Sequence, residues 1–71
     1  MDIRILVGKR VKELRNKLKI SQEELADIAE LDRTYITSVE RGKRNISIIN
    51  VEKLANALQV SLSTFFAFKE Q

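Results

Sequence analysis

The chain has 71 residues, neither cysteine nor histidine, and a formal net charge of +3 at pH 7. A chain of this length is enough for one domain, which we expect over residues 1–71. Without cysteine and histidine it has no disulfides, no thiolate chemistry and no histidine base or ligand. We therefore expect a protein that is not an enzyme and that binds no metal, cofactor or small-molecule substrate. No apolar run is long enough to cross a bilayer and none resembles a cleaved leader, so we expect a cytoplasmic protein that does not enter a membrane.

A first helix is predicted over residues 3–17. Its apolar stripe consists of residues that recur at intervals of four and three: Ile3, Val7, Val11, Leu14 and Leu18. Gly8 is predicted to be a mild weak point on the surface of this helix. The basic residues of the segment form either a solvated face or a set of phosphate anchors. They are Lys9, Arg10, Lys12, Arg15, Lys17 and Lys19.

A second helix is predicted to begin at Gln22, because Ser21 and Glu24 have the spacing of a capping box. Acidic side chains occupy one face of this helix, and an apolar stripe occupies the other. The stripe is predicted to consist of Leu25, Ile28 and Ala29.

A third helix is predicted to follow about three residues later, capped by Asp32 and ended by Gly42 in a left-handed conformation. Ile36 and Val39 point inward, and four polar residues point outward. The outward residues are Arg33, Thr34, Thr37 and Ser38. Two helices joined so closely cross steeply, which is the geometry of a DNA-reading helix-turn-helix.

Charge is distributed unevenly along the chain. Residues 1–20 carry +5, residues 21–40 carry −5 and residues 41–50 carry +3. The acidic middle block would be repelled by phosphate if binding depended on charge alone. We therefore expect specific contacts from the third helix and phosphate anchoring by the basic flanks.

Two further helices complete an all-α chain with no strand. Lys43, Arg44 and Asn45 form a predicted loop, after which Ser47 can cap a fourth helix. The inward face of that helix is predicted to consist of Val51, Leu54, Ala55 and Leu58. Ser61 and Thr64 open a short fifth helix near residues 61–67.

The fifth helix is also the predicted dimer interface, formed by Leu62, Phe65, Phe66 and Phe68. Three phenylalanines within four residues are more aromatic surface than the terminal turn of a small core can cover, which favours a twofold dimer. The alternative is that Phe65 closes the core of a monomer, while Phe66 and Phe68 have no partner.

The strings SQEELA, LDRTYI, ERGKRN and LANALQVSLSTFF together resemble the helix-turn-helix family of the lambdoid-phage repressors and Cro. Within that family, the chain is most similar to the small controller proteins of restriction-modification systems. The resemblance implies a compact five-helix bundle of the lambda-repressor type. It also implies a dimeric regulator that binds a pseudo-palindromic operator in double-stranded DNA and controls its own synthesis.

The resemblance also implies roles for single residues. Base contacts fall on Arg33, Thr34, Thr37 and Ser38, and phosphate contacts on Gln22, Tyr35, Lys43, Arg44 and Asn45. Arg15 and Glu40 match a structural ion pair between the first and third helices. As alternatives, Tyr35 could pack against the edge of the second helix, and Gln22 could be merely a good first-turn residue.

Some alternatives stay open at this point. RNA polymerase is a further candidate partner, since both activation and repression fit a chain without an effector domain. The chain could instead be another small bacterial or phage repressor, or a module that binds proteins. The polar character of the outward face of the third helix favours DNA, because protein-binding faces usually present apolar anchors.

Overall fold

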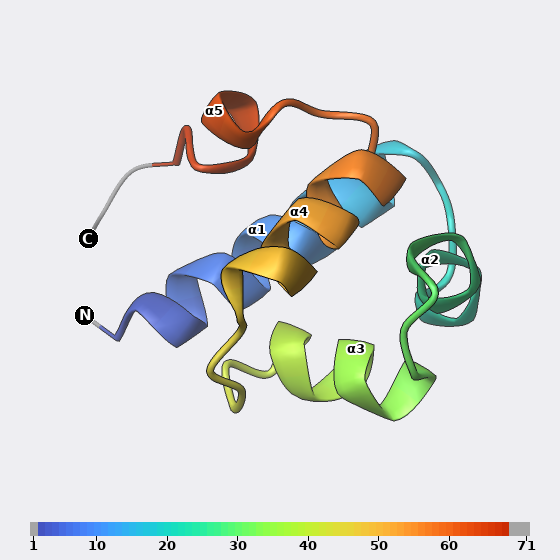
Figure 1. Ribbon diagram of the computed structural model, residues 1–71, viewed down its shortest axis with the longest axis horizontal. Coiled ribbons are helices and arrows are strands. Elements are labelled where there is room, and N and C mark those ends of the chain that lie inside the picture. The colour runs from blue at the N-terminus through green and yellow to red at the C-terminus, as the bar shows by residue number, and fades with distance from the viewer. Residues whose placement is uncertain (1, 69–71) are drawn as a thin grey trace.

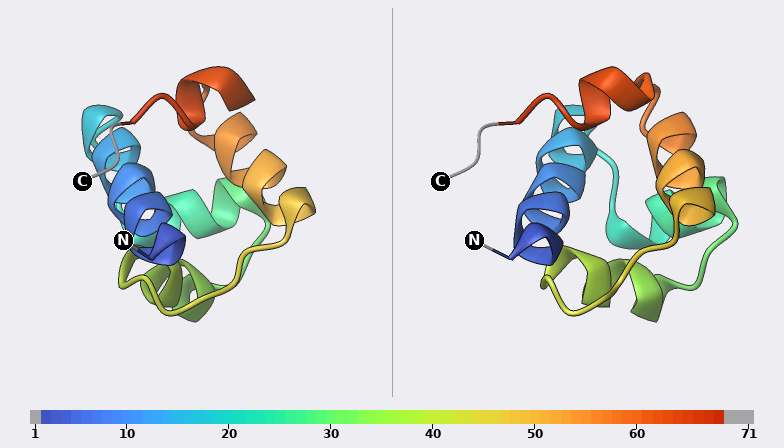
Figure 2. Two further views of the ribbon diagram at one scale, coloured as in Figure 1. Left: turned by 90° about the vertical axis from the view of Figure 1, so that its left-hand side faces the viewer. Right: turned by 60° about the vertical axis from the view of Figure 1, so that its left-hand side comes forward.

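The computed structural model describes residues 2–68, which form five helices without a strand, as predicted. They are α1 (Ile3–Lys17), α2 (Gln22–Ala29), α3 (Arg33–Glu40), α4 (Ile48–Ala57) and α5 (Leu62–Phe65). α1 packs against α3, α2 packs against both α3 and α4, and α5 packs against α4 (Figure 1). Two further views separate α1 from α4 and show α5 near the end of the bundle away from α3 (Figure 2). None of the helices in this part of the chain is long and apolar enough to span a membrane.

Each helix begins at a polar side chain that accepts a hydrogen bond from the backbone of its first turn. These caps are Asp2, Ser21, Asp32, Ser47 and Ser61. The capping box at α2 is complete: the Ser21 hydroxyl accepts from the Glu24 amide at 3.0 Å, and the Glu24 carboxylate accepts from the Ser21 amide at 3.0 Å. Gly42 has a φ of 74°, so the predicted left-handed end of α3 is confirmed.

Three other helices end at residues that the sequence did not mark as left-handed. Lys19, Glu30 and Gln59 have φ values of 58°, 58° and 62°. Each is followed by an apolar residue, and these three apolar residues, Ile20, Leu31 and Val60, pack against the core. Their backbone amides also bond back to carbonyls inside the preceding helix. This is the Schellman arrangement, in which the packing of the partly buried apolar residue stabilises a turn that is unfavourable for a non-glycine residue.

The core lies where α1, α2, α3 and α4 meet, and it closes over Phe65 of α5. It contains the predicted inward face of α4 and most of the predicted stripe of α1. The stripe predicted for α2 is partly wrong, because Ile28 is 58% exposed and Ala26 is buried in its place. Leu25, Ala26 and Ala29 share one face, and Ile28 lies about 100° from the centre of that face. Ile3 is likewise exposed, and Leu6 is buried instead.

Gly8 is buried against α3, so its prediction as a surface weak point is wrong. A Cβ atom at this position would lie 2.3 Å from the backbone oxygen of Val39 and 3.0 Å from that of Glu40. The absence of a side chain lets the backbone of α1 touch the last turn of α3. Gly8 therefore helps to set the position of α3 in the bundle.

Candidate nucleic-acid interface

The outer face of α3 is polar and is presented to solvent at its N-terminal end. Arg33 and Thr34 are exposed, whereas Thr37 and Ser38 are half-buried. The Asp32 carboxylate accepts from the Thr34 amide at 2.9 Å and from the Thr34 hydroxyl at 2.7 Å. These bonds hold the pKa of Asp32 below its usual value of 3.8. The structure thus brings the four predicted base-contacting residues onto one helix face.

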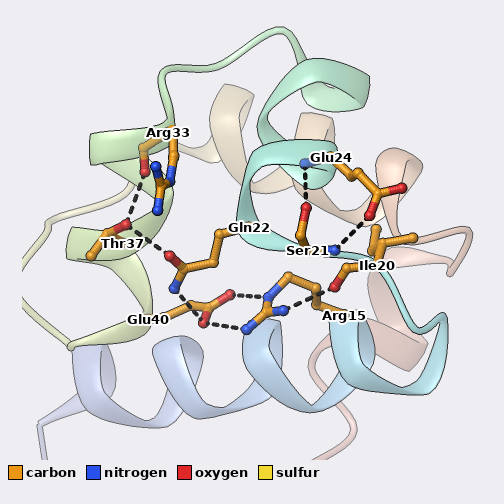
Figure 3. Close-up of polar contacts among 8 residues, drawn as sticks. All are labelled: Arg15, Ile20, Ser21, Gln22, Glu24, Arg33, Thr37 and Glu40. Carbon is orange, nitrogen blue, oxygen red and sulfur yellow. Dashed lines mark hydrogen bonds and ion pairs between the residues drawn. The ribbon is translucent and has the colours of Figure 1, made fainter.

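A buried ion pair ties α3 to α1 (Figure 3). Arg15 donates from Nε to Glu40 Oε2 at 2.7 Å and from Nη2 to Glu40 Oε1 at 3.0 Å. The Glu40 side chain is only 4% exposed, and its carboxylate raises the pKa of Arg15. Arg15 also donates to the carbonyl of Ile20 at 2.9 Å, which fastens the connection between α1 and α2. Arg15 has the structural position that the family resemblance implied.

Gln22 extends this network from Glu40 to the middle of α3. Its Nε2 donates to Glu40 Oε1 at 3.0 Å, and its Oε1 accepts from the Thr37 hydroxyl at 2.9 Å (Figure 3). The Thr37 hydroxyl also lies 3.1 Å from the carbonyl of Arg33. Gln22 therefore braces α3 against the start of α2, and it is more than a good first-turn residue. Because both polar ends of its amide are used, the angle between the two helices is held by side chains as well as by the turn.

Tyr35 links α3 to the loop and to α4. Its ring is half-buried against the core, and its hydroxyl accepts from Asn50 Nδ2 at 3.1 Å. The guanidinium carbon of Arg44 lies 5.1 Å from the centre of the Tyr35 ring, which is a cation–π contact. Neither partner of Tyr35 is predictable from local sequence, because Asn50 and Arg44 are 15 and 9 positions away in the chain.

The predicted basic loop lies directly after the C-terminal end of α3. Lys43, Arg44 and Asn45 are all exposed, and the Lys43 amide bonds back to the carbonyl of Ser38 at 3.0 Å. Positive charge is therefore gathered beside the last turn of α3, while Arg33 occupies the first turn. The helix rises about 10 Å between these two points.

The apolar surface around α5 differs from the one predicted. Phe65 is 0% exposed and fills the core, so its assignment to a dimer interface is wrong. In a helix of one turn, the inward-facing side chain contacts the bundle, and the side chains on either side of it stay exposed. Phe66 is 47% exposed, Leu62 is similarly exposed, and Phe68 is half-buried. The Phe65 and Phe66 rings form a T-shaped pair, with centroids 5.0 Å apart.

A shallow groove of about 290 Å³ extends this apolar surface from Phe66 to the start of α4. Ile3, Ile46 and Ile48 line it, and Ile48 is 86% exposed. The signal for this surface was the apolar run at residues 46–49, which lies before the inward stripe of α4 begins. Among residues 2–68, no cluster of three or more His, Cys, Asp or Glu residues could hold a metal ion.

The chain is similar in sequence and in fold to helix-turn-helix proteins, among them control proteins of restriction-modification systems. The sequence model described as "Helix-turn-helix" matches residues 11–65. Control protein C.MunI of a Mycoplasma species is 46% identical over 67 residues, which cover 93% of this chain and 90% of that protein. The crystal structure of the restriction-modification controller protein C.AhdI from Aeromonas hydrophila matches with a TM-score of 0.86 and 44% identity, over 89% of this chain and 91% of that one. The controller protein C.Esp1396I, solved as a tetramer in complex with its natural 35 base-pair operator, matches with a TM-score of 0.87 and 36% identity, over 93% and 87% of the two chains.

Proposed function

We propose, since this chain belongs to the helix-turn-helix family and groups there with the restriction-modification control proteins, that it is a sequence-specific regulator that binds double-stranded DNA. The observation that carries this proposal is the polar outer face of α3, held rigidly to α1 and α2 by the network of Arg15, Gln22 and Glu40. A helix that reads base edges must be placed to within a fraction of an ångström, and this largely shielded side-chain network provides that placement.

In this proposal α3 lies in the major groove and its polar face reads base pairs. Arg33 presents a fork of donors that matches O6 and N7 of guanine. The Thr34 hydroxyl donates to Asp32, so the groups it has left for DNA are its methyl group and an oxygen lone pair. Thr37 and Ser38 lie further along the same face and complete the base-contacting set.

In this proposal, phosphate contacts lie beside the base-reading residues of α3. We assign them to Lys43, Arg44 and Asn45 in the exposed loop, to Gln22 at the start of α2 and to Tyr35 on α3. The cation–π contact with Tyr35 restricts the Arg44 side chain, which lowers the entropy lost when it meets a phosphate. These contacts strengthen binding to every sequence and make the affinity fall with salt.

We further propose that the protein acts as a twofold dimer through the flanks of α5. Leu62, Phe66 and Phe68 form the centre of this surface, and the groove lined by Ile48 borders it. An exposed apolar surface of this kind on so small a domain favours self-association. Such a dimer places two recognition helices about 34 Å apart, one turn of the duplex. The control protein C.Esp1396I binds its operator as a tetramer, which is consistent with association beyond one chain.

The remaining parts of the assignment follow from the same family. We propose a cytoplasmic protein without enzymatic activity, because the proteins it resembles are helix-turn-helix control proteins. RNA polymerase is the additional partner that an activating form would need. Transcription in vitro, with purified polymerase and an operator placed at increasing distances from the promoter, separates activation from repression.

Selection of bound duplexes from a random pool tests the function itself. Near physiological salt, the proposal predicts a twofold-symmetric consensus with half-sites about one helical turn apart. Enrichment of no sequence, with only weak salt-sensitive binding, would contradict it and favour a protein-binding module.

A further inference from the structure

Arg10 connects the middle of α1 to the end of α5. Its Nε donates to the carbonyl of Phe65 at 3.0 Å, and its Nη2 donates to the carbonyl of Thr64 at 2.5 Å. Its Nη1 pairs with Glu13 at 2.6 Å. Only 10% of the Arg10 side chain is exposed, so this residue does not belong to the solvated basic face that the sequence suggested.

The two carbonyls that Arg10 contacts belong to the last turn of α5. Carbonyls at a helix end carry partial negative charge that a cation stabilises, and the Thr64 carbonyl also accepts from the Ala67 amide at 3.1 Å. α5 has four residues, too few to be stable by its own backbone bonds. It is therefore held by tertiary contacts, of which the buried Phe65 ring is one and the Arg10 guanidinium is another.

These two contacts hold α5 in different ways. The buried Phe65 ring anchors the helix in the core through a single side chain. The guanidinium holds two successive backbone carbonyls, which restricts rotation of the helix about that anchor. Leu62 and Phe66, the exposed apolar side chains, lie on either side of the held segment. Their direction depends on the Arg10 contact.

We propose that Arg10 is a positioning residue for dimerisation, which holds the Leu62 and Phe66 surface in the orientation that a second copy of the chain recognises. The inference rests on the dimer proposed above. Glu13 supports it by fixing the third arm of the guanidinium, and the same contact lowers the pKa of Glu13. Lysine could not replace this arginine fully, because a single ammonium group does not span two carbonyls and a carboxylate.

Sedimentation equilibrium of Arg10→Met and Arg10→Lys, beside the wild type, tests this role. Methionine keeps the length of the apolar stem and removes every donor, and Lys12→Met is a control that removes one exposed positive charge from the same helix. We expect the dimer dissociation constant to rise at least tenfold in Arg10→Met, by a smaller factor in Arg10→Lys, and less than twofold in Lys12→Met.

Amide hydrogen exchange separates loss of positioning from loss of the fold. In Arg10→Met we expect about tenfold faster exchange at Phe66 and Ala67, whose amides bond within α5, and no change at Leu58 in the core. Equal acceleration at all three amides would mean general destabilisation and would overturn the proposal. If Arg10→Met does not fold, an Arg10→Lys protein with the wild-type dissociation constant would overturn it as well.

The outcomes distinguish this proposal from the dimer on which it rests. A wild type that stays at 8.2 kDa up to hundreds of micromolar would refute the dimer, and this role with it. A dimeric wild type whose constant is unchanged in Arg10→Met would refute the role of Arg10 alone.

Discussion

Replacing Gly8 with alanine should destabilise the protein, although the same change in an exposed helix would stabilise it. Alanine favours a helix over glycine by about 1 kcal/mol, which is the gain expected at a surface position. The new Cβ would lie 2.3 Å from the backbone oxygen of Val39, where ordinary contacts begin at 3.4 Å. The backbone of α3 must therefore move by about 1 Å, since neither neighbour is a flexible side chain.

Overpacking of this kind costs about 1–3 kcal/mol, and contact between two backbones places Gly8→Ala at the upper end. After the gain in helix propensity is subtracted, we expect a loss of about 2 kcal/mol in the free energy of unfolding. The corresponding fall in Tm is about 10 °C for a domain of this size.

Urea denaturation followed by circular dichroism measures this change, provided that the m-value stays constant. Asn16→Ala, at an exposed position of the same helix, is the control and should raise stability by a few tenths of a kcal/mol. A Gly8→Ala protein as stable as the wild type, or more stable, would refute the close packing of α1 on α3.

Three further substitutions test other parts of the structure. Glu40→Gln leaves the Arg15 guanidinium without its counter-charge and should lower the free energy of unfolding, measured by urea denaturation, by about 3 kcal/mol. Replacing both Arg15 and Glu40 with methionine should lower it by less, and an equal or larger loss in that double variant would contradict this account. Asp32→Asn keeps a helix cap but removes its titration. Because folding lowers the Asp32 pKa, the charge stabilises the wild type fully above about pH 4, and this stabilisation disappears as the pH falls through the folded-state pKa. The difference in unfolding free energy between the two proteins should therefore shrink between pH 5 and pH 2, and a constant difference would exclude this contribution. Phe66→Ser should raise the dimer dissociation constant at least tenfold in analytical ultracentrifugation, and an unchanged constant would exclude Phe66 from the interface.

Much of this fold follows from local sequence signals. Ser21 and Glu24 predict the start of α2 because a capping box involves only residues within one turn. Gly42 predicts the end of α3 for the same reason, since its left-handed conformation is local. The left-handed residues Lys19 and Glu30 could not be predicted, because packing of the following apolar residue against the core stabilises them and that packing depends on the whole bundle.

The wrongly assigned residues are those whose environment depends on contacts with distant parts of the chain, which helical periodicity does not report. Gly8 and Arg10 lie on α1 at positions that a helical pattern assigns to solvent, yet both contact distant parts of the chain. Phe65 and Phe66 are adjacent, and composition could not tell which ring faces the core. One turn of helix is too short for its stripe to be read. Contacts across 30 to 55 positions decide these cases, and they become visible only when the helices are packed.

The outward face of α3 is the part of the site that the sequence predicted most directly, and its role in reading bases is the central claim. With the selected operator available, the most direct measurement is the affinity of wild type and Arg33→Ala for duplexes that carry every single base-pair substitution. We expect Arg33→Ala to lose about 1–3 kcal/mol of discrimination at one base pair of each half-site and to keep the wild-type preferences elsewhere. A uniform loss at all positions would show that Arg33 contacts only the backbone and would contradict the reading of DNA by α3.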